Sequence, residues 1–144
     1  MLGDLGETWS FAILNRAFRL LQANPDAALV ALGMTRYWRA AEGLRLDVGP
    51  FVAALESASG RKAVVLGKPA RSFFEIALAT LECPAAEAVM IGDDIAIDVG
   101  GAQQAGMQAL LVRTGKFHQN DLAGVIQPDA ILNSIADLPA WWRA

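Results

Sequence analysis

Three aspartates follow one short apolar segment at a spacing that suits a metal site. The segment ends at Ile91 and leads into Gly92, Asp93 and Asp94, and Asp98 comes about one helical turn later. Adjacent carboxylates at a strand end offer oxygen ligands to a hard cation, and Mg²⁺ commonly uses one or two carboxylates plus waters and phosphate oxygens. The alternative is that Asp93 or Asp94 caps a helix while the other carboxylates are solvated. The full pattern Gly-Asp-Asp-x-x-x-Asp favours the metal site.

A lysine at a loop–helix junction is the second candidate. Lys68 lies between Gly67 and Pro69, where its ammonium would present a point charge to a phosphate beside a helix N-terminus. A lone loop lysine is more often simply solvated, so the weight of Lys68 comes from its pairing with Asp93. Lys116 follows the next strand; a position near the same edge is one interpretation, and a surface loop is the favoured one.

Other active-site patterns and partners are poorly supported. His118 is the sole histidine and Cys83 the sole cysteine, which argues against a zinc site and a disulfide framework. The sequence contains no Gly-x-Ser-x-Gly elbow and no P-loop. A net charge of −3 gives no electrostatic case for nucleic acid as a partner. No apolar run is long enough for a membrane helix, and a reducing cytoplasmic setting is expected.

The elements that must position these residues alternate between strands and helices in the second half of the chain. The predicted elements are strands at 63–66, 88–91, 108–112 and 130–132, with helices at 70–81 and 97–105. This alternation indicates a parallel α/β sheet, in which the chemistry lies beyond the carboxyl ends of the strands. The inward positions predicted for the helix at 70–81 are Phe73, Ile76, Ala77 and Leu81. Ser134 or Asn133 is expected to cap a short final helix.

The pattern of residues 1–60 predicts two helices on either side of an irregular stretch. The first helix starts after Thr8 as N-cap and ends at Asn24, with an apolar stripe of Phe11, Leu14, Phe18 and Leu21. A strand is expected at 28–32, and residues 33–47 are irregular or hairpin-like. Pro50 suits the first turn of the second helix and Gly60 its end. The stripe predicted for this helix is Phe51, Ala54, Leu55 and Ala58. With 54% hydrophobic and 19% charged residues, the chain has the composition of a folded protein.

Taken together, the motifs resemble those of a known enzyme family. Gly67-Lys68-Pro69, followed about two dozen residues later by Met90-Ile91-Gly92-Asp93-Asp94-x-x-x-Asp98, resembles the third and fourth motifs of haloacid-dehalogenase (HAD) hydrolases. Residues 101–116 continue the match, and residues 14–21 and 49–55 are similar to the class with a large α/β (C2-type) cap. The resemblance implies a partial Rossmann-like parallel sheet flanked by helices and preceded by a cap remnant. The implied boundaries are 1–48 for the cap remnant and 49–144 for the C-terminal part of the core.

The resemblance also implies roles for the candidate residues. Lys68 would bind the phosphoryl group and neutralise its charge, and Asp93 would ligate Mg²⁺. Asp94 would act through a metal-bound water or by holding the lysine, and Asp98 would support the metal site. The implied reaction is hydrolysis of a phosphoric monoester or phosphoamide in a small substrate. Arg36 and Tyr37 follow a cap-like strand and are candidate substrate contacts, although a plain surface hairpin is the favoured interpretation.

One family motif has no counterpart in these residues. The family's nucleophile lies in an Asp-x-Asp-Gly stretch, and no such stretch occurs in the sequence. Asp4 is no substitute, because Gly3-Asp4-Leu5-Gly6 lacks the second aspartate. We therefore expect a truncated core that is inactive alone and lacks the central strand beside the one that bears Asp93. The expected partner is another copy of the chain or the missing N-terminal fragment.

Two functions from different classes remain open at this point. The chain is either part of a HAD phosphatase or a non-catalytic module that binds magnesium, phosphate or a protein partner. A receiver-like signalling domain also combines an acidic pair with a lysine. It is disfavoured, because such a domain needs the acidic pair near the N-terminus and the phosphoacceptor on a later strand.

Overall fold

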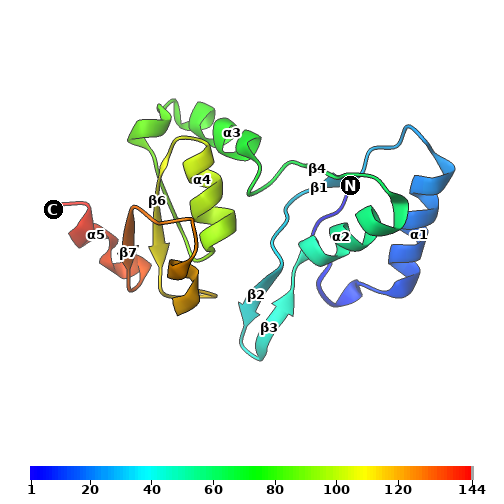
Figure 1. The fold of residues 1–144 in the computed structure, drawn as a ribbon, viewed down its shortest axis with the longest axis horizontal. Coiled ribbons are helices and arrows are strands. Elements are labelled where there is room, and N and C mark those ends of the chain that lie inside the picture. Colours follow the sequence, from blue (N-terminus) through cyan, green and yellow to red (C-terminus); the bar gives the residue numbers. More distant parts are fainter. Residues whose placement is uncertain (144) are drawn as a thin grey trace. The chain divides into compact units, whose positions relative to one another are not determined.

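The computed structural model describes residues 1–143, which form two compact units that meet in sequence between Gly67 and Lys68 (Figure 1). The sequence placed a boundary earlier, between residues 48 and 49. The difference arises because helix α2 (Val48–Ser59) buries Val48 and Val52 in the core of the first unit, so the helix belongs with the residues before it.

The first unit combines two helices with short strands. Its elements are a 3₁₀ turn at Gly6–Thr8, α1 (Phe11–Ala23), β1 (Val30–Ala31), β2 (Tyr37–Ala40), β3 (Gly43–Leu46), α2 and β4 (Val64–Val65). Strand β1 pairs in parallel with β4, and Leu2 forms a parallel bridge to Ala31. Strands β2 and β3 form an antiparallel hairpin, which confirms the hairpin predicted for 33–47.

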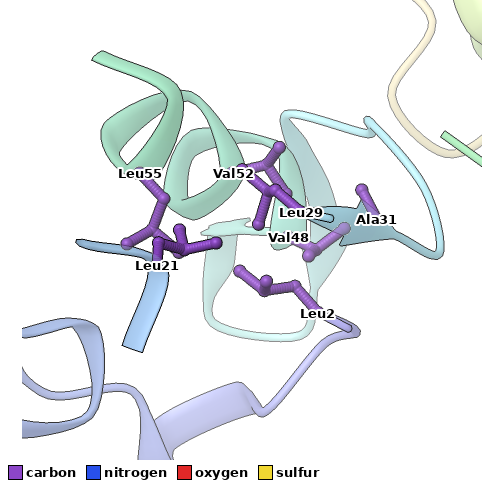
Figure 2. Close-up of a cluster of buried hydrophobic side chains, with 7 residues drawn as sticks. All are labelled: Leu2, Leu21, Leu29, Ala31, Val48, Val52 and Leu55. Atoms are coloured by element: carbon purple, nitrogen blue, oxygen red, sulfur yellow. The ribbon is translucent and has the colours of Figure 1, made fainter. Parts of the chain in front are cut away.

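Seven buried apolar side chains form the core of this unit, and Figure 2 shows them converging from the N-terminal segment, α1, β1 and α2. They are Leu2, Leu21, Leu29, Ala31, Val48, Val52 and Leu55. The predicted helix faces are only partly right, since Phe11 is 83% exposed and Phe51 is only half-buried. A shift of one residue turns a side chain about 100° around the helix, so the packing partners decide which residues face inward.

The start of α1 differs from the prediction, whereas that of α2 agrees with it. Ser10, rather than Thr8, caps α1, with its Oγ accepting the N–H of Ile13 at 3.3 Å. Helix α2 begins at Val48, capped by Asp47, so Pro50 lies in its first turn, as predicted. Both caps are the short polar residues that satisfy the first free N–H groups of a helix.

The second unit is built on a three-stranded parallel sheet in the order β5-β6-β7. Its elements are α3 (Arg71–Leu81), β5 (Val89–Gly92), a π-helical segment (Ile95–Gly100), α4 (Gly101–Gln104), β6 (Gln108–Val112), β7 (Ala130–Leu132) and α5 (Leu138–Trp141). Further 3₁₀ turns lie at Ala85–Glu87, Gln119–Ala123 and Ile135–Asp137. The parallel sheet of β5, β6 and β7 confirms the predicted fold class. Ser134 caps the turn at Ile135–Asp137, as predicted.

The central strand β6 is buried on both faces. Ala109 and Leu111 pack against α3 and α4 on one face, whereas Leu110 and Val112 pack with residues of α5 on the other face. This alternation follows from the period of two along a strand. The sheet therefore forms the middle layer of the second unit, with helices on either side (Figure 1).

Two sequence-based expectations for this region are wrong. Strand β4 pairs with β1 in the first unit and does not join the sheet of β5, β6 and β7. In α3, Phe74 is the buried residue, while Ile76 and Leu81 are 66% and 67% exposed. The Phe74 side chain points inward because its ring packs against Gly101. A residue with a Cβ at position 101 would clash with this ring.

Strand β5 lies at one end of the three-stranded sheet. Within residues 1–143 it pairs only with β6. No helix in this part of the chain is long and apolar enough to cross a membrane.

Replacing Leu111 by alanine should destabilise the second unit by about 2–5 kcal/mol, because its side chain is fully buried in the sheet core. Leu81→Ala is the matched control, since the same atoms are removed from a side chain that is 67% exposed. Its effect should stay within about 0.5 kcal/mol. Urea unfolding of both variants measures the difference, and equal losses would contradict the described core.

Candidate functional site

The candidate site lies where the carboxyl ends of β5 and β6 meet. The two strands are parallel and in register, with Gly92 opposite Leu111. The loop that carries Asp93 and Asp94 therefore lies beside the loop that follows β6, which contains Gly115 and Lys116. Two segments more than 20 residues apart in sequence are brought together by strand pairing alone.

Asp98 and Lys68 form one ion pair of the site. Lys68 Nζ donates to Asp98 Oδ1 at 2.8 Å. The Asp98 side chain is 7% exposed, whereas that of Lys68 is 37% exposed. The other carboxylate oxygen of Asp98 accepts the backbone N–H of Asp94 at 3.2 Å. A buried carboxylate thus anchors the ammonium while part of the lysine still faces solvent.

Gly92 makes this arrangement possible. A Cβ at Gly92 would overlap the carboxylate of Asp98. The glycine before the two aspartates therefore has a packing role: it leaves room for the side chain of the third one.

Asp94 has two functions in the structure. Its Oδ1 accepts the N–H groups of Ala96 and Ile97 at 2.9 and 3.0 Å, so it caps the following helix. Its Oδ2 lies 2.6 Å from Lys116 Nζ. Burial by itself would raise the pKa of Asp94, but the hydrogen bond and charge of Lys116 and the two backbone donors outweigh burial and lower it below the ordinary 3.8. The helix-cap alternative considered from the sequence is confirmed for this residue.

Asp93 is held by the neighbouring loop. Its Oδ2 accepts the backbone N–H of Lys116 at 2.9 Å. Gly115 has φ of +64°, a conformation that favours glycine. A Cβ at this position would also overlap Asp93 Oδ2. Conformation and close approach both require glycine here, and the result is a carboxylate fixed in direction at the strand end.

The structure thus brings Lys68, Asp93, Asp94 and Asp98 to one edge of the sheet. For Lys116 the sequence favoured a surface loop over a position near this edge, and that choice is wrong. The Lys116 side chain is only 11% exposed and forms an ion pair. The available signal was its position just after the strand that follows the Asp93 strand, because loops after neighbouring parallel strands meet.

Arg36 and Tyr37 lie in the first unit, at the start of the β2–β3 hairpin. The guanidinium of Arg36 lies 5.8 Å from the centre of the Tyr37 ring. The hairpin itself is as expected, and a role for these two residues in substrate binding stays a prediction.

The chemistry of the donor set fits a magnesium ion. Asp93 and Asp94 present only carboxylate oxygens, which are hard ligands. Among residues 1–143, no three His, Cys, Asp or Glu side chains converge into a ready cage. A magnesium ion that keeps waters and meets phosphate oxygens needs no such cage. Coordination by Asp93, Asp94 and Asp98 together stays a prediction.

Comparison with known proteins identifies the class to which this fold and site belong. Residues 65–138 match a family model described as HAD-hydrolase-like. This match covers half of the chain and includes every residue of the site just described. The chain belongs to the HAD-like hydrolase family.

Two relatives are a named phosphatase and a hydrolase domain-containing protein of that family. The chain is 46% identical over 138 residues to the phospholysine phosphohistidine inorganic pyrophosphate phosphatase of Mus musculus, covering 95% of this chain and 51% of the relative. It is 49% identical over 121 residues to haloacid dehalogenase-like hydrolase domain-containing protein 2 of Homo sapiens. That match covers 84% of this chain and 46% of the relative. The chain therefore spans about half the length of these relatives.

A solved structure agrees with the fold. The glycerol phosphate phosphatase of Mycobacterium tuberculosis, in complex with magnesium, superimposes with a TM-score of 0.77 at 30% identity. The match covers 93% of this chain and 40% of that protein. The sequence-based resemblance to HAD hydrolases is thereby confirmed.

Gly115→Ala should unfold more easily than the wild type for two reasons, the positive φ and the overlap with Asp93. Gly60→Ala is the matched control, since Gly60 has φ of +72° but no neighbouring atom within reach of a Cβ. The control should lose about 1 kcal/mol, and Gly115→Ala should lose more. Thermal or urea unfolding gives both values. Equal losses would mean that Asp93 does not pack against Gly115.

The charge of Asp94 should stabilise the fold in a defined pH range. Because its pKa is lower in the folded state, its contribution is fully present above about pH 3.8 and is lost as the pH falls through the folded value. Asp94→Asn retains a good helix cap and removes only the charge. The difference in unfolding free energy between wild type and Asp94→Asn should therefore be constant near neutrality and shrink in acid. A difference that grows in acid would contradict the ion pair with Lys116.

Proposed function

We propose that this chain forms the metal- and phosphate-binding part of a magnesium-dependent HAD phosphatase. Its substrate would be a small phosphorylated compound, either a phosphoric monoester or a phosphoamide. The observation that carries this proposal is the position of Lys68, held by the buried Asp98 at the strand end that bears Asp93. A cation for the phosphate and a carboxylate for a metal lie within one small region.

Each residue has a role that its contacts support. Lys68 would bind the phosphoryl oxygens, because its side chain is partly exposed while Asp98 fixes its direction. Asp93 would be the metal ligand, oriented by the N–H of Lys116. A bound magnesium ion would neutralise phosphate charge as a Lewis acid. Asp94 and Asp98 would support the site, each by holding a lysine.

The nucleophile would come from elsewhere. The 144 residues contain no Asp-x-Asp-Gly stretch, and the chain spans about half the length of its relatives. We propose that a further segment of polypeptide with this stretch completes the site beside the open edge of β5, whereas another copy of the chain would cover that edge without supplying the nucleophile. The isolated chain would then bind magnesium and phosphate without hydrolysing an ester. With a single cysteine, it suits the reducing cytoplasm.

A non-catalytic binding module is the second candidate. The specific observation in its favour is the same missing Asp-x-Asp-Gly stretch, without which no phosphoaspartate forms. In this case the chain would bind magnesium, phosphate or a protein partner as its whole function. Arg36 and Tyr37, on the exposed hairpin, would remain candidate contacts for a substrate in the phosphatase proposal.

Magnesium should stabilise the isolated chain, and Asp93→Asn should abolish the effect. Ligand binding to the folded state alone adds about 2.7 kcal/mol at a concentration 100 times the dissociation constant. Thermal unfolding with and without MgCl₂ measures this gain. An equal gain in Asp93→Asn would mean that magnesium binds at another site.

Inorganic phosphate tests the role of Lys68 in the same assay. Lys68→Met should lose the additional stabilisation by phosphate, whereas Lys62→Met should keep it. Lys62 is the matched control because its side chain is 91% exposed and belongs to the first unit. Phosphate stabilisation that survives in Lys68→Met would refute the assigned role.

Turnover of p-nitrophenyl phosphate separates the two candidate functions. The isolated chain should show none. Activity that appears when a polypeptide with an Asp-x-Asp-Gly stretch is added would support the phosphatase proposal. Turnover by the chain alone, lost in Lys68→Met, would mean that a nucleophile exists within these residues.

A further inference from the structure

Lys116 is a buried charged residue to which the proposed function gives no role of its own. Its ammonium lies 2.6 Å from Asp94 Oδ2, and the two side chains are only 11% and 17% exposed. Its backbone N–H, in contrast, donates to Asp93 Oδ2 at 2.9 Å. One residue therefore contacts both members of the adjacent aspartate pair, but through different groups.

The two aspartates consequently differ in what they can still bind. Asp94 uses both carboxylate oxygens within the protein, Oδ1 for two backbone N–H groups and Oδ2 for the Lys116 ammonium. To become a metal ligand it would have to exchange one of these partners for the cation. Asp93 receives a neutral backbone donor, which orients a carboxylate and leaves its negative charge for a cation.

We propose that Lys116 is a positioning residue that holds Asp94 out of the metal coordination shell, so that Asp93 is the one ligand from this aspartate pair. The inference rests on the proposed magnesium site and deepens it. A single carboxylate plus waters suits magnesium, whereas calcium takes six to eight oxygen ligands.

The backbone of the same loop supports this selection. Gly115 lies against the carboxylate of Asp93 so closely that no side chain would fit there. The loop thus fixes Asp93 with its main chain and Asp94 with the lysine side chain. The exposure of the two lysines also separates their roles, because Lys68 reaches solvent and Lys116 is enclosed.

Removing the lysine should release the second carboxylate. Lys116→Met is expected to bind Mg²⁺ about threefold or more tightly than the wild type, because affinity rises with the number of charged ligands. The gain for Ca²⁺ should be larger than that for Mg²⁺, since calcium uses the extra oxygens. Loss of a nearby positive charge alone would raise both affinities by a similar factor. Isothermal titration of the 144-residue chain with MgCl₂ and CaCl₂ measures both ions.

A charge-matched double variant gives the decisive comparison. Asp94→Asn combined with Lys116→Met keeps the net charge of the site and the helix cap. If Asp94 is not a ligand in the wild type, the double variant should bind Mg²⁺ within about twofold of the wild type. Lys116→Arg retains the ion pair and should also resemble the wild type, and Lys62→Met controls for overall charge. Circular dichroism establishes that each variant is folded.

The outcomes distinguish this inference from the proposed function. Wild-type Mg²⁺ binding that is lost in Asp93→Asn supports the proposed function, and its absence would overturn both proposals. Given such binding, a double variant that loses most of its Mg²⁺ affinity would overturn the inference alone, because Asp94 would then be a ligand. An unchanged affinity in Lys116→Met would overturn it as well. If Lys116→Met fails to fold, the Mg²⁺ affinities of the double variant and of Lys116→Arg still test the inference.

Discussion

The parallel pairing of β5 with β6 is the interaction on which the site depends. Gly92 lies opposite Leu111, so the chain leaves both strands at the same edge of the sheet. The aspartates of one loop and the glycine and lysine of the other then meet within hydrogen-bonding distance. Leu110 and Leu111 are fully buried on opposite faces of β6, so apolar packing on both sides of the sheet holds the strand in place.

Buried charge is the main energetic constraint at this edge. Asp98 and Asp94 lie largely out of water, and an unpaired carboxylate in such a place would be strongly destabilising. Each is therefore paired with a lysine and also accepts backbone N–H groups. The arrangement has a chemical consequence, because the paired carboxylates are largely satisfied by the protein. Asp93, oriented by a main-chain donor, is the carboxylate that we propose as the metal ligand.

The glycines of the two loops serve this packing directly. Gly92 leaves room for Asp98 and Gly115 leaves room for Asp93. Both lie in motifs by which the chain resembles HAD hydrolases, and the family match includes them. Part of what makes these motifs recognisable is therefore the close approach of carboxylates to the backbone, in addition to the chemistry of the charged residues.

The sequence by itself determined the strands from β5 onward, the parallel sheet, the cap at Ser134 and the group of Lys68, Asp93, Asp94 and Asp98. These features depend on local patterns, namely apolar runs, turn residues and short motifs that are read within a few positions. Only the tertiary structure decided that α2 belongs to the first unit, that Phe74 is the buried residue of α3, and which lysine pairs with which aspartate. Those choices are made by partners distant in sequence, and the two lysine–aspartate pairs join residues 30 and 22 positions apart. On a helix, a change of one position turns a side chain by about 100°, so local periodicity leaves the buried face undecided until its partner is in place.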